Sequence, residues 1–322
     1  MFLAFTVMRQ HPFAYSALTV AALVWGGSIV GQKIALGSFS AVEVSILRGI
    51  GALCILIPLW WWSEGGRVAF SRRDLAALSL LGLAVLGNHL LTLLGLQYIG
   101  AAAAGVIIGA SPAMTAFLSS LLIGDVPFRL VWMGCVLSFA GVVLVSGVGG
   151  ATVSGEQPWL GGILVVLGLM SWALYTIGGR RTMERFSPLT VNWTTLLLSI
   201  IFQLPLLWTD REIAAEGVQA VSAAGWLALA YLIVFATALG QQAWLYGVRG
   251  VGPARAGIFI NLIPVSALLL SALILDDRIG PRELTGIVLI LAGVWLVNRE
   301  SVRSASVDRY EGLSNERPSV PK

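Results

Sequence analysis

Polar side chains inside long apolar stretches are the residues of this sequence that could do chemistry. Asn88 and His89 lie together in one such stretch, and Gln241 and Gln242 lie together in a later one. Amides and an imidazole both donate and accept hydrogen bonds, and polar groups at membrane depth usually turn toward a partner or a cavity. Two interpretations stay open: an interhelical hydrogen bond inside a bundle, or contact with a ligand in a central cavity.

Aromatic residues lie deep within the same kind of stretch. Trp25 and Trp172 are well inside their apolar runs, whereas aromatics of the membrane interface lie near the ends of spans. Ser28 and Tyr175 follow them by three residues on the same helix face. Trp244 lies one turn from Gln241. We expect these aromatics to line a cavity with the polar pairs.

Two prolines could make hinges or gates. Pro112 and Pro264 each interrupt an apolar run, and Asn261 lies three residues before the second of them. A proline removes a backbone hydrogen bond and can open the helix, which leaves carbonyl groups available to water or a ligand. A simple packing kink is the other interpretation.

Arg48 is a charged residue inside an apolar run. A lone guanidinium in the membrane is costly, so it should pair with an acid or extend toward the interface. Glu43, five residues earlier, is the nearest acid along the chain. The sequence therefore predicts a structural ion pair between Glu43 and Arg48.

Catalytic machinery is not visible in the sequence. A membrane-embedded hydrolase would need a base near a nucleophile or metal, and the apolar runs offer one histidine and no clear pair of carboxylates. The glycines from Gly147 to Gly150 are followed by no Walker lysine. We therefore expect no catalytic residue, no metal site and no cofactor. A membrane enzyme and a non-transporting receptor or assembly subunit stay open as alternative functions.

Composition requires a lipid bilayer around the elements that position these residues. The chain is 57% apolar and 11% charged, with a mean hydropathy of +0.87, which a soluble core could not cover. Its basic residues lie between apolar runs rather than in one stripe, so we expect no nucleic-acid partner despite a net charge of +4. The apolar runs predict an all-α protein with ten transmembrane helices, near 14–35, 41–62, 75–97, 101–123, 130–147, 159–178, 189–208, 225–246, 254–275 and 282–298.

Loop charges predict the orientation. With a cytoplasmic N-terminus, the cytoplasmic side collects most of the loop arginines, and both termini are cytoplasmic by the positive-inside rule. That side would hold Arg9, Arg67, Arg72, Arg73, Arg129, Arg180, Arg181, Arg185, Arg249, Arg255 and Arg299, against Lys33, Arg211, Arg278 and Arg282 outside.

An internal repeat organises the chain. An offset of 152 pairs Pro112 with Pro264 and Gly141 with Gly293, and an offset of 147 pairs Trp25 with Trp172 in the first helices. Because each repeat holds five helices, an odd number, the second repeat must enter the membrane from the opposite side, as in many secondary transporters. The predicted parts are a cytoplasmic segment 1–13, a repeat 14–147, an external linker 148–158, a repeat 159–298 and a cytoplasmic tail 299–322.

These repeats resemble a known family. Two sets of five helices, each with a tryptophan in its first helix, a proline in its fourth and an acid (Asp125, Asp277) before a glycine-spaced fifth, resemble the EamA family of the drug/metabolite transporter superfamily. Family members usually carry glutamate at those acidic positions. The resemblance implies a ten-helix exporter or exchanger of amino acids, metabolites or drugs in the bacterial inner membrane, and it is strongest to the YddG-type aromatic amino acid exporters.

The predicted function is secondary transport. We expect a small metabolite, an uncharged or zwitterionic molecule with apolar bulk such as an amino acid, to bind between the halves. No nucleotide-binding loop is present, so downhill facilitation or exchange is the simpler hypothesis for the energy source. The sequence does not predict an oligomeric state.

Overall fold

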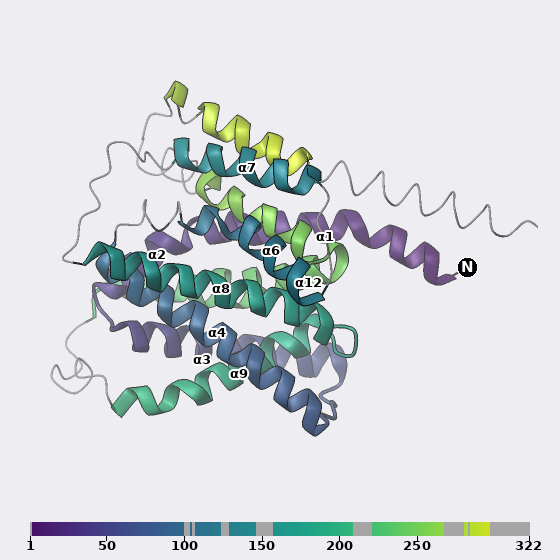
Figure 1. The fold of residues 1–322 in the computed structure, drawn as a ribbon. Helices are drawn as coiled ribbons and strands as arrows, with labels where there is room; N and C mark the ends of the chain where they lie inside the picture. Colours follow the sequence, from purple (N-terminus) through teal and green to yellow (C-terminus); the bar gives the residue numbers. More distant parts are fainter. Residues whose placement is uncertain are drawn as a thin grey trace, which may run out of the picture.

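The structure is a computed structural model, and it describes residues 2–99, 104, 107–123, 129–145, 157–208, 221–266, 280–282 and 284–296. The predicted linker 148–158, except for its last two residues, and the tail 299–322 lie outside this part of the chain. Within it, the chain is helical and no strand occurs (Figure 1). The prediction of an all-α fold is therefore confirmed.

The helices follow the predicted runs. The first half of the chain forms α1 (Phe2–Gly26), α2 (Ser28–Leu36), α3 (Ala41–Glu64), α4 (Arg72–Tyr98), α6 (Ser111–Ile123) and α7 (Arg129–Val145). The second half forms α8 (Pro158–Thr182), α9 (Pro188–Gln203), η1 (Leu204–Trp208), α11 (Ala223–Tyr231), η2 (Leu232–Gly240), α12 (Gln241–Val251), α13 (Pro253–Gly257), η3 (Ile258–Asn261) and a last helix at Leu284–Leu296.

Six of the ten predicted spans are confirmed as helices of transmembrane length and hydropathy. They are Pro12–Leu36, Ala41–Glu64, Arg72–Tyr98, Pro158–Thr182, Pro188–Leu207 and Ala223–Val251. The other four runs contain shorter described helices, so their membrane crossing stays a prediction. Large apolar side chains such as Leu80, Val136 and Leu227 are 68%, 69% and 73% exposed, as expected of helices that face lipid.

Serine caps begin the helices at loop boundaries. Ser40 begins α3 with a capping box, in which its side chain accepts from the Glu43 N–H and the Glu43 carboxylate accepts from the Ser40 N–H. Ser187 begins α9 with one of the two hydrogen bonds of such a box: its side chain accepts from the Thr190 N–H at 2.9 Å. Ser40 and Ser187 are paired by the sequence repeat at an offset of 147.

Glycines allow α4 to pack closely along α8, and α1 along α12 (Figure 1). A Cβ added at Gly95 would lie 2.7 Å from the Val165 side chain and 2.9 Å from the Gly161 carbonyl oxygen. A Cβ added at Gly247 would lie 2.4 Å from the Leu18 side chain and 3.1 Å from the Ala14 carbonyl oxygen. Both pairs of helices therefore approach too closely for any side chain at these points.

Glycines also allow close packing between α7 and the last helix, which lie side by side in Figure 1. A Cβ at Gly141 would lie 2.5 Å from the Gly286 carbonyl oxygen, and one at Gly293 would lie 2.6 Å from the Gly134 carbonyl oxygen. Residue numbers rise along one helix as they fall along the other, so the two helices are antiparallel.

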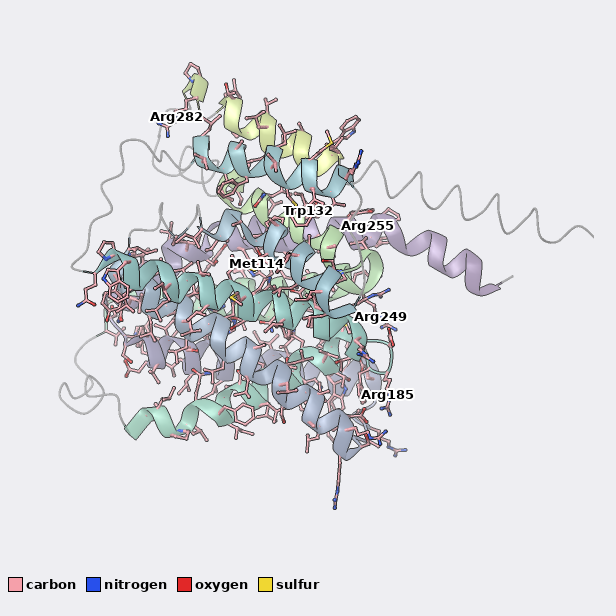
Figure 2. All side chains as sticks on the ribbon, viewed as in Figure 1. Met114, Trp132, Arg185, Arg249, Arg255 and Arg282 are labelled. Carbon is pink, nitrogen blue, oxygen red and sulfur yellow. The ribbon has the colours of Figure 1, made fainter. Side chains whose placement is uncertain are left out.

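Basic side chains mark the two ends of the bundle. Figure 2 shows Arg185, Arg249 and Arg255 at one end, which is also the end from which α1 extends, and Arg282 at the opposite end. The prediction had placed the first three on the cytoplasmic side and Arg282 outside. The two groups thus lie at opposite ends, as the predicted topology requires.

Candidate functional site

A cavity of about 120 Å³ lies among the helices. At about 10–15 Å³ for each water-sized group, it has room for a molecule of about ten non-hydrogen atoms. Six of the ten predicted substrate-binding residues line it: Trp25, Ser28, Asn88, His89, Trp172 and Gln241. They come from α1, α2, α4, α8 and α12, so residues distant in the sequence meet at one place.

Two tryptophans form one wall of the cavity, and a third supports them from behind. The rings of Trp25 and Trp172 meet edge to face at 5.2 Å, and Trp244 packs behind them at 5.4 Å from Trp25 and 5.7 Å from Trp172. The Trp25 Nε1 donates to the Ala236 carbonyl at 2.9 Å, and the Trp244 Nε1 donates to the Thr176 hydroxyl at 3.1 Å. Because these N–H groups have partners, the rings are held in fixed orientations and present an apolar surface.

Four predicted ligand-binding residues lie behind the cavity surface instead of on it. Tyr175 and Trp244 are buried against the wall, where the Tyr175 hydroxyl accepts from the Gln241 Nε2 at 3.0 Å. The Gln242 side-chain oxygen accepts from Asn192 at 3.1 Å, and the Asn261 Nδ2 donates to the Ser138 hydroxyl at 2.6 Å. These four therefore support the lining, and the structure gives them no place on the cavity surface.

Arg48 lines the cavity, and its predicted ion pair with Glu43 is wrong. The Glu43 carboxylate accepts from the Ser40 N–H at 2.8 Å at the start of α3, while the Arg48 Nε donates to the Thr237 hydroxyl at 2.9 Å. Residues five apart lie about 140° apart around a helix, so the two side chains leave α3 in different directions. The arginine is 6% exposed, and it makes no salt bridge within the described part of the chain.

A nine-residue π-helix, η2, was not predicted. It places Thr237 against Arg48 and the Ala236 carbonyl against Trp25. Segments of π-helix are rare and frequently occur at functional sites. Its residues, LIVFATALG, show no pattern that separates a π-helix from an α-helix, so the hydropathy of the sequence could not predict it.

The prolines follow interruptions in their helices. Pro112 is the second residue of α6, after a turn at Ala110, and Pro264 follows the 3-10 helix η3. Residues just before each proline line the cavity at positions that the offset of 152 makes equivalent, namely Ile108 with Ile260 and Ser111 with Ile263. A hinge or gate at Pro112 and Pro264 stays a prediction.

Three further polar residues line the cavity without having been predicted as ligands: Gln32, Thr92 and Ser111. Gln32 lies one helical turn after Ser28, and its Nε2 donates to the Ser28 carbonyl at 3.2 Å. Thr92 lies three residues after His89. Spacings of three and four residues from the predicted ligands were thus the signal that could have found two of them.

The fold and the cavity define a multi-pass α-helical membrane protein with an internal cavity. The chain belongs to the EamA-like transporter family, whose model matches residues 12–147 and 159–299.

Relatives with curated names cover most of the chain. It is 26% identical over 289 residues to an uncharacterized transporter, YyaM, of Bacillus subtilis (strain 168), which covers 88% of this chain and 93% of the relative. It is 27% identical over 292 residues to an uncharacterized inner membrane transporter, YedA, of Escherichia coli (strain K12), covering 90% and 92%. A solved crystal structure with 17% identity superposes with a TM-score of 0.73 and covers 88% of this chain and 98% of its own, which supports the fold.

Proposed function

We propose that this protein is a secondary transporter that carries a small metabolite across the inner membrane by alternating access. The observation that carries the proposal is that equivalent positions from both halves line one cavity. Trp25 and Trp172 form one such pair, and His89 and Gln241 form another. A site between related halves is what a transporter needs if one half rocks against the other around a bound substrate.

The proposal includes an inverted repeat formed by residues 14–147 and 159–298. In its support, Gly95 meets Val165 and Gly161 while Gly247 meets Leu18 and Ala14. An offset of 152 relates Gly95 to Gly247, and an offset of 147 relates Ala14 to Gly161 and Leu18 to Val165. The two sets of contacts are therefore equivalent. Antiparallel packing of α7 on the last helix, with reciprocal glycine contacts, is the arrangement that a two-fold axis in the membrane plane produces. Pro112 and Pro264 would then be matching hinges.

The proposed cargo has apolar bulk and a polar end. Trp25 and Trp172 offer flat apolar area, and Asn88, His89 and Gln241 offer a few hydrogen-bonding groups. The resemblance to YddG-type exporters makes an aromatic amino acid the first class to test. Exchange or downhill movement is the proposed mode, since the chain has no nucleotide-binding loop.

A counterflow experiment separates a transporter from the alternatives. Proteoliposomes preloaded with unlabelled L-phenylalanine or phenylacetate should transiently accumulate the same labelled compound above the level in protein-free liposomes. A receptor or assembly subunit would bind label only in proportion to the protein present, and an enzyme would convert it. Absence of accumulation for both compounds, with binding retained, would overturn the proposal.

We also propose that the protein lies in the inner membrane, as the name of the relative YedA suggests. In the proposed orientation both termini are cytoplasmic and the segment around Thr152 is outside. The arginines at one end of the bundle support this orientation (Figure 2). A cysteine at Thr152 should react with an impermeant maleimide added to intact cells, while a cysteine at exposed Arg73 should react only after lysis. Reversed labelling would contradict the topology.

A further inference from the structure

Arg48 is a buried cation in the wall of the cavity, and no acid of the described residues pairs with it. It is 6% exposed and lines the cavity, and the hydrogen bond it makes is from Nε to the Thr237 hydroxyl. No carboxylate of the described residues lies within 4.0 Å of its guanidinium. The Nη groups therefore have no protein acceptor in this part of the chain.

Burial of such a charge is costly unless something compensates it. Charged groups inside a membrane protein are usually paired or face a ligand or water-filled pathway. None of the described residues that line the cavity carries a carboxylate, and the other titratable one is His89. The cavity wall thus has a fixed positive charge that none of the described residues neutralises, so an anionic ligand could supply the missing negative charge.

We propose that the Arg48 guanidinium binds the carboxylate of the transported molecule and that the cavity favours a monocarboxylate over a zwitterion. The planar guanidinium has donors spaced to bind both carboxylate oxygens, and such charge-assisted hydrogen bonds are among the strongest in proteins. An ammonium group on the same molecule would meet no acid among the described residues that line the cavity.

Cavity shape defines the rest of the ligand. Trp25 and Trp172 form an apolar wall, and the volume of about 120 Å³ fits about ten non-hydrogen atoms. An aryl or short alkyl carboxylate such as phenylacetate has this size, with a flat apolar body and one carboxylate. The inference rests on the proposed function, because it assigns the substrate class of the same cavity.

The test is equilibrium binding of labelled phenylacetate to the purified full-length protein, with two competitors of nearly the same shape. Phenylacetamide replaces the carboxylate with a neutral amide, and phenylglycine adds an ammonium group. We expect each competitor to be at least about tenfold weaker than unlabelled phenylacetate. Phenylacetamide loses the charge-assisted contact with Arg48, and phenylglycine places an ammonium group among described lining residues that include no acid. In Arg48→Gln, phenylacetate affinity should fall by at least about tenfold while phenylacetamide affinity changes by less than about twofold.

Two further variants keep the result interpretable. Arg129→Gln removes an exposed arginine at the start of α7 and should leave binding unchanged. Arg48→Lys keeps the charge without the planar donor pair and should retain part of the affinity. Because Arg48→Gln removes an unpaired buried charge, its melting temperature should equal or exceed that of the wild type. A lower melting temperature with unchanged phenylacetate affinity would instead make Arg48 a structural residue and overturn the proposal.

Other outcomes also decide the question. Stronger competition by phenylglycine than by phenylacetate would make the substrate a zwitterion, and absence of phenylacetate binding by the wild type at millimolar concentration would remove the carboxylate site. Failure of the proposed function gives a different result: Arg48-dependent binding without counterflow. Counterflow that Arg48→Gln leaves unchanged for every carboxylate would keep the transporter and overturn the carboxylate site.

Discussion

The two halves contribute similar apolar residues to the cavity wall at two pairs of equivalent positions, but among the described lining residues only the first half contributes an arginine. Trp25 of the first half corresponds to Trp172 of the second, and Ile108 corresponds to Ile260. Arg48, by contrast, corresponds at an offset of 147 to Thr195, whose hydroxyl donates to the Val191 carbonyl at 2.8 Å within its own helix. The proposed duplication would therefore supply the aromatic wall twice, whereas the position of Arg48 carries a cation in the first half only. The difference suggests that both halves give the cavity its shape and the first half determines the charge it selects.

Close packing at the glycines should give the largest effects if the halves are equivalent. Gly95→Leu and Gly247→Leu each force a side chain into a neighbouring helix, with the carbonyl oxygens of Gly161 and Ala14 in the way. We expect each to destabilise the protein by about 3 kcal/mol or more, which should appear as lost monodisperse protein in detergent.

A matched control for these variants is available on α8. A Cβ at Gly162 would have Ile107 as its nearest neighbour, at 3.9 Å, so Gly162→Leu should express and fold normally. If Gly95→Leu were tolerated as well as Gly162→Leu while Gly247→Leu unfolded the protein, the packing of the two halves would not be equivalent.

The aromatic wall should give the next largest effect, on transport. Trp172 packs on Trp25, Trp244 and Tyr175 and is 7% exposed, so Trp172→Ala would also cost stability, about 3–5 kcal/mol. Trp25→Phe and Trp172→Phe keep the apolar character and lose part of the wall. We expect each to lower the initial counterflow rate by about threefold to tenfold, about 1 kcal/mol, at an unchanged amount of folded protein.

Equal losses for the two phenylalanine variants would support two equivalent walls. A loss confined to Trp25→Phe would show that the first half carries recognition as well as charge. Trp62→Phe is the control, because this tryptophan is 85% exposed and should leave the rate unchanged.

Helix caps should give smaller effects and compare the halves outside the cavity. Ser40→Ala removes the acceptor for the Glu43 N–H in α3, and Ser187→Ala removes the acceptor for the Thr190 N–H in α9. Each should lower the free energy of unfolding by about 1 kcal/mol, measured by thermal unfolding in one detergent. Exposed Ser63→Ala is the control, since Ser63 bonds only within the last turn of α3. If only Ser40→Ala lowered the free energy of unfolding, other contacts would be holding the start of α9, such as the hydrogen bond from the Thr190 hydroxyl to Glu64.

Hydropathy predicted the helices well because the bilayer requires long apolar runs, and the repeat predicted which positions correspond. The sequence offset also predicted the meeting of Trp25, His89, Trp172 and Gln241 around one cavity, because a two-fold repeat would place them at equivalent depths. The positions of neighbouring residues were harder to predict from the sequence. Tyr175 lies on the same helix as Trp172, yet its hydroxyl meets Gln241 behind the wall, a contact between helices that periodicity within one helix cannot give.

Arg48 shows the other limit of the sequence argument. Distance along the chain suggested Glu43 as its partner, but helical geometry separates residues five apart, and the acid was needed at the third position of α3. Thr237, the residue that meets Arg48, is far away in the sequence and reaches it through the π-helix η2. Local hydropathy predicts neither the π-helical hydrogen-bond pattern of η2 nor the packing of the helices around it.

The smallest expected effect belongs to Glu43→Gln, and it decides whether the charge of the first half is really unpaired. If Glu43 neutralised Arg48, removing the acid would leave a buried cation alone and cost about 3–5 kcal/mol. In the structure Glu43 instead completes the capping box with Ser40, and glutamine can make the same hydrogen bond to the Ser40 N–H. Only the attraction between a carboxylate and the N-terminus of α3 is lost, about 0.3–1 kcal/mol. We therefore expect a slight drop in melting temperature and an unchanged phenylacetate affinity, whereas a large loss of stability would restore the ion pair and remove the reason for Arg48 to bind a carboxylate.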